Sequence, residues 1–378
     1  MLYYLHELTE WIAPLRIFRY ITFRALGGAA TAFLLSLMIG KTMIGMLKAL
    51  KIGQPVRILD SRTLFEMHGG KAGTPTMGGL LILATVTVST LLWAIPSNGY
   101  VLITLATMLV MGGIGFWDDY LKVTKRNSKG LNARMKLAFQ FLWGFIAVGF
   151  LYAWPESRAY VSQLMVPFLK DPVVQNLSVL GTLIFCSLVL TGATNAVNLT
   201  DGLDGLAIGC ANAAAVAYLM LAYVAGNLVF ASYLQVPYIA GTGELAVFCG
   251  CLLGAGMGFL WFNCHPAKVF MGDTGSLALG GAIAMVAICV KQELLLIIVG
   301  GVFVMEAMSV IIQVISFKLT GRRVFLCSPL HHHFEFKEKA KAEREGRDLE
   351  VVETMITTRF WILAMICALF GIATLKIR

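Results

Sequence analysis

Ten long apolar runs limit what this chain can fold into more than any other feature of its sequence. A helix needs roughly 20 mostly apolar residues to cross a bilayer, whereas the strands of a membrane barrel alternate in polarity over about 10 residues. The runs here are long and uniformly apolar, so we predict an all-α integral membrane protein, a bundle of ten transmembrane helices. We expect one domain over residues 1–378, with spans at approximately 21–46, 75–95, 100–117, 137–154, 176–196, 205–226, 244–262, 275–290, 294–317 and 358–376.

The composition agrees with this prediction. Hydrophobic residues make up 58% of the chain and charged residues only 13%, against about 25% charged residues in a soluble domain. Most of the surface therefore faces membrane lipids. The net charge of +9 comes from basic residues spread over the loops that flank the spans. Such loops contact anionic lipid head groups, so the charge indicates no nucleic-acid partner.

The distribution of lysine and arginine predicts the orientation. With ten spans, both termini lie on one side of the membrane. The other side carries 22 of the 30 lysines and arginines, and its loops lie near 47–74, 118–136, 197–204, 263–274 and 318–357. Basic loops stay in the cytoplasm. We therefore expect these loops to be cytoplasmic and both termini to be periplasmic.

The polar residues with chemical character gather in the predicted cytoplasmic loops. Asp118 and Asp119 close the third span, just before a loop with six basic residues. Anions at a helix C-terminus oppose the helix dipole, and two adjacent carboxylates repel each other. The alternative is a solvated helix end. The pair instead favours a site where the carboxylates share a cation or a proton.

Two further acidic segments belong to the same side. Asp201 and Asp204 lie in the segment Asn198–Gly205, which has no basic residue; one of them could cap the following helix, but two caps are not needed. Asp273 enters the eighth span after the loop 263–272. A helix N-terminus favours phosphate, and a carboxylate beside it favours a metal. The alternative for Asp273 is a simple N-cap.

Two other motifs carry polar side chains. His331, His332 and His333 follow one another, a spacing that does not suit zinc, so we expect them to contact phosphate or to assist proton transfer. The alternative is a polar surface turn. The segment 71–79 opens the second span with Lys71 and Thr76 among glycines, which could hold phosphate although the segment is not a Walker A motif.

Together these motifs predict a chemistry. Several aspartates without soft ligands suit Mg²⁺ with a diphosphate, because Mg²⁺ prefers oxygen ligands. Catalysis of phosphoryl transfer then depends on positioning and on offsetting charge. The membrane setting suggests that one reactant is a lipid. We expect an enzyme whose active site lies in the cytoplasmic loops.

The motifs in this order, over nearly the whole chain, resemble the phospho-N-acetylmuramoyl-pentapeptide transferases of the polyprenyl-phosphate N-acetylhexosamine-1-phosphate transferase superfamily. The stretch PLHHHFE at 329–335 favours this branch over the N-acetylglucosamine-1-phosphate transferases. The resemblance implies an Mg²⁺-dependent enzyme of the bacterial cytoplasmic membrane that forms a homodimer. It implies that UDP-N-acetylmuramoyl-pentapeptide and undecaprenyl phosphate give lipid I and UMP, the first membrane step of peptidoglycan synthesis.

The resemblance also implies roles for particular residues. Asp118 would be the base that acts on the lipid phosphate, with Asp119 beside it, and Asp273 would be the principal Mg²⁺ ligand of the three. The remaining roles fall into three groups: Lys71, Thr76, Asn195, Asn198 and Asp201 at the nucleotide and diphosphate; Asp204, Asn263 and Phe270 at the uridine; His331, His332 and His333 at the sugar–phosphate region, with His332 among the catalytic residues.

Two rival functions remain open at this point. One is a sister transferase that uses UDP-N-acetylglucosamine. The other is a transporter or lipid flippase, which would place charges near the bilayer midplane, often in repeated halves. Only Glu306 lies deep in a predicted span, where an ionised carboxylate is costly, so we expect it to be protonated or hydrogen-bonded inside the bundle. The charged stretch 336–350 predicts a solvated helix or a flexible loop.

Overall fold

The structure is a computed structural model that describes residues 1–50, 73–125 and 130–377. Over these residues the regular secondary structure is helical and contains no β-strand, so the all-α prediction is confirmed. The helices are α1 (Ile21–Ala49), α3 (Gly79–Trp93), α4 (Gly99–Lys125), α5 (Ala133–Ala153), α6 (Pro155–Val161), α7 (Val179–Thr200), α8 (Leu206–Ala225), α9 (Leu228–Leu234), α10 (Glu244–Asn263), α11 (Gly272–Cys289), α12 (Leu296–Val299), α13 (Gly301–Thr320), α14 (Leu330–Glu345) and α15 (Glu350–Ala373), with the 3-10 segments η1 (Leu2–Glu10), η2 (Ala13–Arg19) and η4 (Thr374–Lys376).

Within the described ranges, nine helices are long and apolar enough to cross a membrane, so the chain is a multi-pass membrane protein. The run predicted at 75–95 differs, because its helix α3 has only 15 residues. The amides of Gly78 and Gly79 donate to the carbonyls of Phe270 and Met271, at 2.9 and 3.0 Å. This pairing holds the segment before Gly79 out of the helix. The span predicted at 294–317 is divided at Gly300 into α12 and α13.

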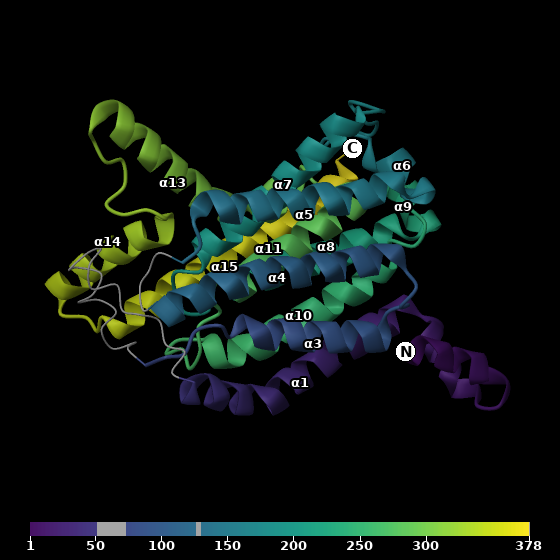
Figure 1. The fold of residues 1–378 in the computed structure, drawn as a ribbon, viewed down its shortest axis with the longest axis horizontal. Helices are drawn as coiled ribbons and strands as arrows, with labels where there is room; N and C mark the ends of the chain where they lie inside the picture. Colours follow the sequence, from purple (N-terminus) through teal and green to yellow (C-terminus); the bar gives the residue numbers. More distant parts are fainter. Residues whose placement is uncertain (51–72, 126–129, 378) are drawn as a thin grey trace.

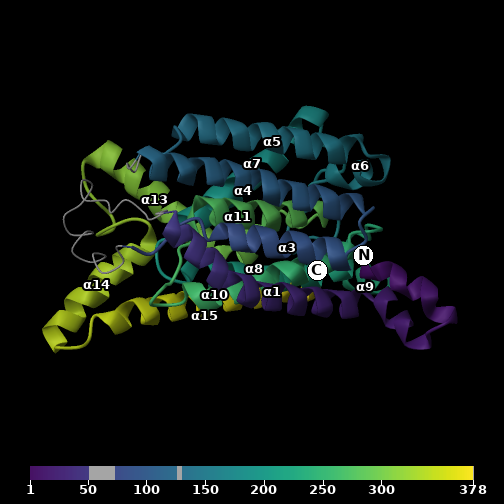
Figure 2. The ribbon, with the colours of Figure 1, turned by 60° about the horizontal axis from the view of Figure 1, so that its bottom comes forward.

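Helix α11 lies at the centre of the bundle, with α4, α7, α3 and α8 packed around it (Figures 1 and 2). Of the 18 residues of this helix, 94% are buried inside the protein. The helix is rich in glycine and alanine, which lets neighbouring backbones approach closely. A Cβ on Gly280, for example, would lie 2.6 Å from the Cα of Thr194 on α7. The central position of α11 matters because its first turn carries Asp273.

The glycine repeat of α10 packs against α1. A Cβ on Gly250 or Gly254 would lie 2.5 or 2.0 Å from the carbonyl oxygens of Ala25 and Ala29, and one on Gly258 would lie 2.4 Å from the Cβ of Ser36. Close helix packing through glycines four residues apart is a common device in membranes.

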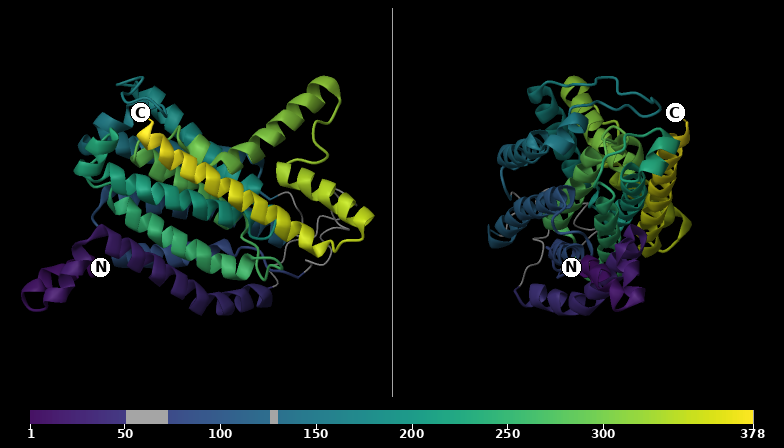
Figure 3. Two further views of the ribbon diagram at one scale, coloured as in Figure 1. Left: turned by 180° about the vertical axis from the view of Figure 1, so that it is seen from behind. Right: turned by 90° about the vertical axis from the view of Figure 1, so that its right-hand side faces the viewer.

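The two termini lie at the end of the bundle opposite α14 (Figure 1 and the left view of Figure 3). The ends of α4 and α7 and the start of α11, which carry the predicted aspartates, point toward the end where α14 lies (Figure 1). The charged stretch predicted as a solvated helix or a loop is largely helical, since α14 continues from the histidines to Glu345. Glu306 is fully buried, and its carboxylate accepts a hydrogen bond from the amide of His331 at 3.1 Å, as its burial requires.

Candidate active site

Three carboxylates meet where the end of α4 crosses the start of α11. Asp118 and Asp119 come from α4 and Asp273 from α11, and one oxygen of each lies within 4.8 Å of the others. The crossing is this close because Gly115, one turn before Asp119, has no side chain: a Cβ there would lie 2.1 Å from the backbone oxygen of Asp273. Residues 154 positions apart in the chain are therefore brought to one point.

Asp119 caps the N-terminus of α11. Its Oδ1 accepts from the amide of Asp273 at 3.2 Å, and its Oδ2 accepts from the amide and the hydroxyl of Thr274 at 2.9 and 2.8 Å. A carboxylate at this end also interacts favourably with the helix dipole. The cap of α11 is thus supplied by another helix, and the alternative reading of Asp273 as a simple N-cap is wrong. Asp119 holds the backbone that carries Asp273.

Asp118 is held by different donors. Its Oδ1 accepts from the amide of Leu131 at 2.6 Å, and its Oδ2 lies 2.7 Å from the Nζ of Lys122, one turn further along α4. Gly130 has a φ of +48°, and a Cβ on it would lie 2.4 Å from Asp118 Oδ1. Only glycine allows the backbone to pass this carboxylate so closely.

Two lysines and an asparagine complete the carboxylate centre. The Nζ atoms of Lys122 and Lys136 lie 3.0 and 2.7 Å from Oδ2 of Asp273. Asn198 donates to Oδ1 of Asp273 at 2.8 Å and to the hydroxyl of Ser276 at 2.9 Å. The centre thus contains two ammonium groups and three carboxylates. Such an arrangement can bind phosphate and a cation together.

Asp201 lies between this centre and the next polar cluster. Burial and the negative charges of Asp273, Asp119 and Asp204 raise the pKa of Asp201 to about 8, against a backbone hydrogen bond from Gly272 that lowers it. The charges of both clusters therefore act on one carboxyl group. A bound cation would offset this repulsion.

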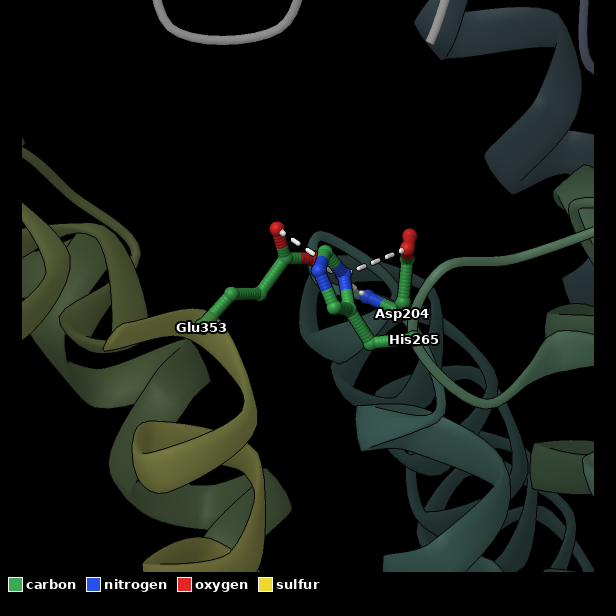
Figure 4. Close-up of side chains that lie close together, drawn as sticks. All are labelled: Asp204, His265 and Glu353. Atoms are coloured by element: carbon green, nitrogen blue, oxygen red, sulfur yellow. Dashed lines mark hydrogen bonds and ion pairs between the residues drawn. The ribbon is translucent and has the colours of Figure 1, made fainter. Parts of the chain in front are cut away.

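A second cluster joins Asp204, His265 and Glu353 (Figure 4). The Nδ1 of His265 lies 3.1 Å from Oδ2 of Asp204 and 3.6 Å from Oε2 of Glu353. Asn263 is buried beside it, and its amide accepts from Gly205 N at 3.1 Å and donates to Val269 O at 2.9 Å. The predicted uridine residue Asn263 thus links the turn after α7 to the loop before α11.

The remaining predicted residues are placed as follows. Thr76 is buried, and its hydroxyl lies beside Gly272. Gly272 has a φ of +71°, and a Cβ added to it would lie 2.9 Å from that hydroxyl. Phe270 is half-buried.

Asn195 donates to Gln140 Oε1 at 2.7 Å and to Thr191 O at 2.8 Å. Its amide group therefore takes part in the packing of α5 against α7. Lys71 lies outside the described residues.

The three histidines begin α14 in different environments. His331 is fully buried, its Nδ1 lies 3.1 Å from Oε2 of Glu306, and burial lowers its pKa. A Cβ added to Gly202 would lie 2.1 Å from Nε2 of His331, so the His331 ring packs directly under the turn that carries Asp201.

The other two histidines have different partners. His332 Nδ1 lies 2.8 Å from Glu335 Oε2, and His333 Nδ1 accepts from the amide of Leu326 at 3.2 Å.

The chain is similar in sequence to known enzymes of one family. Residues 101–291 match the family model of glycosyl transferase family 4, and residues 71–83 match signature 1 of the phospho-N-acetylmuramoyl-pentapeptide-transferases. The chain is 49% identical to the phospho-N-acetylmuramoyl-pentapeptide-transferase of Methylacidiphilum infernorum, with all of both chains covered. It is 50% identical to that of Desulfotalea psychrophila over 99% of each chain, and 49% identical to that of Rhodopseudomonas palustris over the full length of both. The chain belongs to the phospho-N-acetylmuramoyl-pentapeptide-transferase family.

An apolar cavity lies in the membrane-spanning part of this transferase. It has a volume of about 430 Å³ and lies between α7, α11, α12 and α13. Its lining includes Leu188, Val197, Ile283, Leu296, Phe303 and Met308. Val197 immediately precedes Asn198, the residue bonded to Asp273. The cavity therefore lies in the apolar part of the bundle, and Val197 is the lining residue next in sequence to the polar centre, with Glu293 among the other lining residues.

Four residues of this transferase's polar site receive no site role from the sequence: Lys122, Lys136, His265 and Glu353. From the sequence, Lys122 and Lys136 serve only as charges that orient the chain. The spacing of Lys122 gave a usable signal, because residues four apart share a helix face and Asp118 precedes it by four. Lys136 and Glu353 gave no such signal, since their partners lie 137 and 149 residues away in the chain.

Proposed function

We propose that this transferase moves phospho-N-acetylmuramoyl-pentapeptide from its UDP-linked donor to undecaprenyl phosphate, giving lipid I and UMP, with Mg²⁺ as its cofactor. The reaction takes place at the cytoplasmic face of the bacterial inner membrane. The assignment rests on 49% and 50% sequence identity, over nearly the full length, to two phospho-N-acetylmuramoyl-pentapeptide-transferases. The meeting of Asp118, Asp119 and Asp273 supports it with a place for the chemistry.

The donor set suits the cation. Asp118 and Asp273, with Asp119 behind them, offer carboxylate oxygens within 4.8 Å of one another, and Mg²⁺ prefers such ligands together with substrate phosphates. Asp119 is the least available of the three, because both of its oxygens accept bonds from the start of α11. When bound, Mg²⁺ supplies positive charge beside the diphosphate.

The reaction needs alignment more than covalent help from the protein. An oxygen of the lipid phosphate attacks the phosphorus that carries the sugar, a new P–O bond forms, and the bond to UMP breaks. Asp118 orients the attacking phosphate and takes its proton where one is present. Lys122 and Lys136 lie within 3.0 Å of Asp273 and offset the charge that the diphosphate brings to the centre.

The two substrates approach from different sides of the centre. The isoprenoid chain of the lipid occupies the apolar cavity between α7, α11, α12 and α13, whose lining includes Val197, the residue before Asn198. The nucleotide occupies the opposite end, where Phe270 can stack on uracil and Asp204 lies beside His265. His332 faces the sugar–phosphate region from α14.

A direct assay tests the proposal. Purified chain in detergent, given undecaprenyl phosphate and Mg²⁺, should release UMP from UDP-N-acetylmuramoyl-pentapeptide and at most a trace from UDP-N-acetylglucosamine. UMP release from only the smaller sugar would establish the sister transferase instead. A chain that moves lipid across vesicles without any UMP release would establish a flippase.

A further inference from the structure

One face of α15 holds the turn after α7. Glu353 Oε1 accepts from the amide of Asp204 at 3.0 Å. Thr357, one helical turn later, donates its hydroxyl to the carbonyl of Asp204 at 3.4 Å, and Trp361, a further turn along, donates Nε1 to the carbonyl of Gly205 at 3.0 Å. Residues four apart share a helix face. A helix near the C-terminus thus binds the backbone of two successive residues some 150 positions earlier.

The same carboxylate approaches the loop before α11 through His265 (Figure 4). The ring Nδ1 lies between Oδ2 of Asp204 and Oε2 of Glu353, at 3.1 and 3.6 Å. Because an ionised carboxylate only accepts hydrogen bonds, this geometry favours the tautomer of His265 that carries its proton on Nδ1. Oδ2 of Asp204 also accepts from the amide of Ala267 at 3.0 Å. The contacts join the turn, the loop and α15 at one buried point.

Both joined segments lead directly to the reaction centre. The turn carries Asp201, whose pKa responds to Asp273 and Asp119. The loop carries Phe270, whose amide donates to Pro75 O at 2.8 Å, and continues into Gly272 and α11. A displacement at Asp204 would therefore act directly on the turn and the loop at the nucleotide end of the site, whereas the lipid cavity lies further along α7 and α11.

We propose that Glu353 is a positioning residue for the nucleotide: through the Asp204 amide and His265 it sets the turn Asp201–Gly205 against the loop that ends at Phe270. This role rests on the function proposed above, with the nucleotide at that end of the site. A buried ionised group is costly, and Glu353 is 5% exposed. A carboxylate at this buried position is explained if Glu353 orders groups that bind a substrate.

Glu353→Gln separates the two contacts. The side chain keeps its shape and an oxygen for the Asp204 amide, but its NH₂ group faces the proton on Nδ1 of His265. We expect the KM for the UDP-linked sugar to rise about ten-fold, because the attraction between the Glu353 carboxylate and His265 Nδ1, 3.6 Å apart, is replaced by two N–H groups that face each other. We expect kcat and the KM for undecaprenyl phosphate to stay within about two-fold of the wild type. His265→Ala should give the same split with a larger rise in the nucleotide KM, because it also removes the contact to Asp204 Oδ2, and the double variant should be no worse than His265→Ala alone.

The controls make the result specific. Glu345→Gln makes the same chemical change on α14, where the carboxylate is exposed and pairs with Arg347 at 2.7 Å, and should leave all three constants unchanged. UMP affinity, measured by calorimetry without lipid, should fall in Glu353→Gln about as much as the KM rises, with little change in the melting temperature. His265→Asn should recover much of the loss of His265→Ala, since its amide nitrogen can replace Nδ1 as a donor.

Two results would overturn the role of Glu353. One is a nucleotide KM in Glu353→Gln equal to that of Glu345→Gln. The other is a parallel change in kcat, in both KM values and in the melting temperature, which a merely structural contact would give. Wild type and Glu345→Gln report on the proposed reaction in the same assay, so a failure of the positioning role is distinct from a failure of that reaction.

Discussion

Asp273→Asn should lower UMP release by at least about 10³-fold while the helical bundle stays folded. The carboxylate of Asp273 lies 3.0 and 2.7 Å from the ammonium groups of Lys122 and Lys136, and it is one of the three carboxylates that can hold a cation. Asparagine keeps the shape but removes the charge. Lys122 retains its contact to Asp118 at 2.7 Å, so neither folding nor the lysine's position depends on Asp273 alone.

The measurement is lipid I formation and UMP release by purified protein, with the melting temperature recorded for each variant. Asp171→Asn is the matched control, because Asp171 is an exposed carboxylate in the loop between α6 and α7. It should behave as the wild type does. Turnover close to that of the wild type in a folded Asp273→Asn variant would remove Asp273 from the reaction centre.

Gly115→Ala should damage both stability and activity, although it adds a single methyl group at a buried position. That methyl would lie 2.1 Å from the backbone oxygen of Asp273. A backbone atom cannot turn aside as a side chain can, so α11 must shift against α4. Overpacking of this kind costs about 1–3 kcal/mol. A displacement of about 1 Å at a reacting group lowers turnover by about 10²-fold.

Gly113→Ala provides a control on the same helix. Gly113 is exposed, and a Cβ there would meet no atom within 4 Å. We expect its turnover and melting temperature to match those of the wild type, whereas Gly115→Ala should melt several degrees lower, as about 1–3 kcal/mol implies for a domain of this size. Equal behaviour of the two variants would show that the crossing of α4 and α11 does not position Asp273.

The membrane class and the carboxylate cluster could both be predicted from the sequence, for related reasons. In a chain that faces lipid, apolar runs mark spans and polar residues are confined to their ends. The ends then meet because the spans pack into one bundle, as Asp118 and Asp273 do. The short helix α3 could not be predicted, since it starts late only because residues 78–79 pair with the loop before α11.

The direction of individual side chains could not be predicted either. Asn195 and Asn263 belong to the expected motifs, yet their amide groups bind Gln140 and the backbone of two loops, which no local pattern indicates. The histidine run concealed a similar difference: His331 is fully buried against Glu306, while His332 is partly exposed beside Glu335. Such distinctions depend on which helices pack together over long separations in sequence.

The most direct measurement is the dependence of UMP release on Mg²⁺. Purified protein, stripped with a chelator and given both substrates, should release no UMP above background, and added Mg²⁺ should restore turnover to the level of untreated protein. That result is the one expected if a cation binds among Asp118, Asp119 and Asp273, where the carboxylates lie within 4.8 Å of one another. Full turnover in the presence of the chelator would contradict a reaction centre built around one divalent ion.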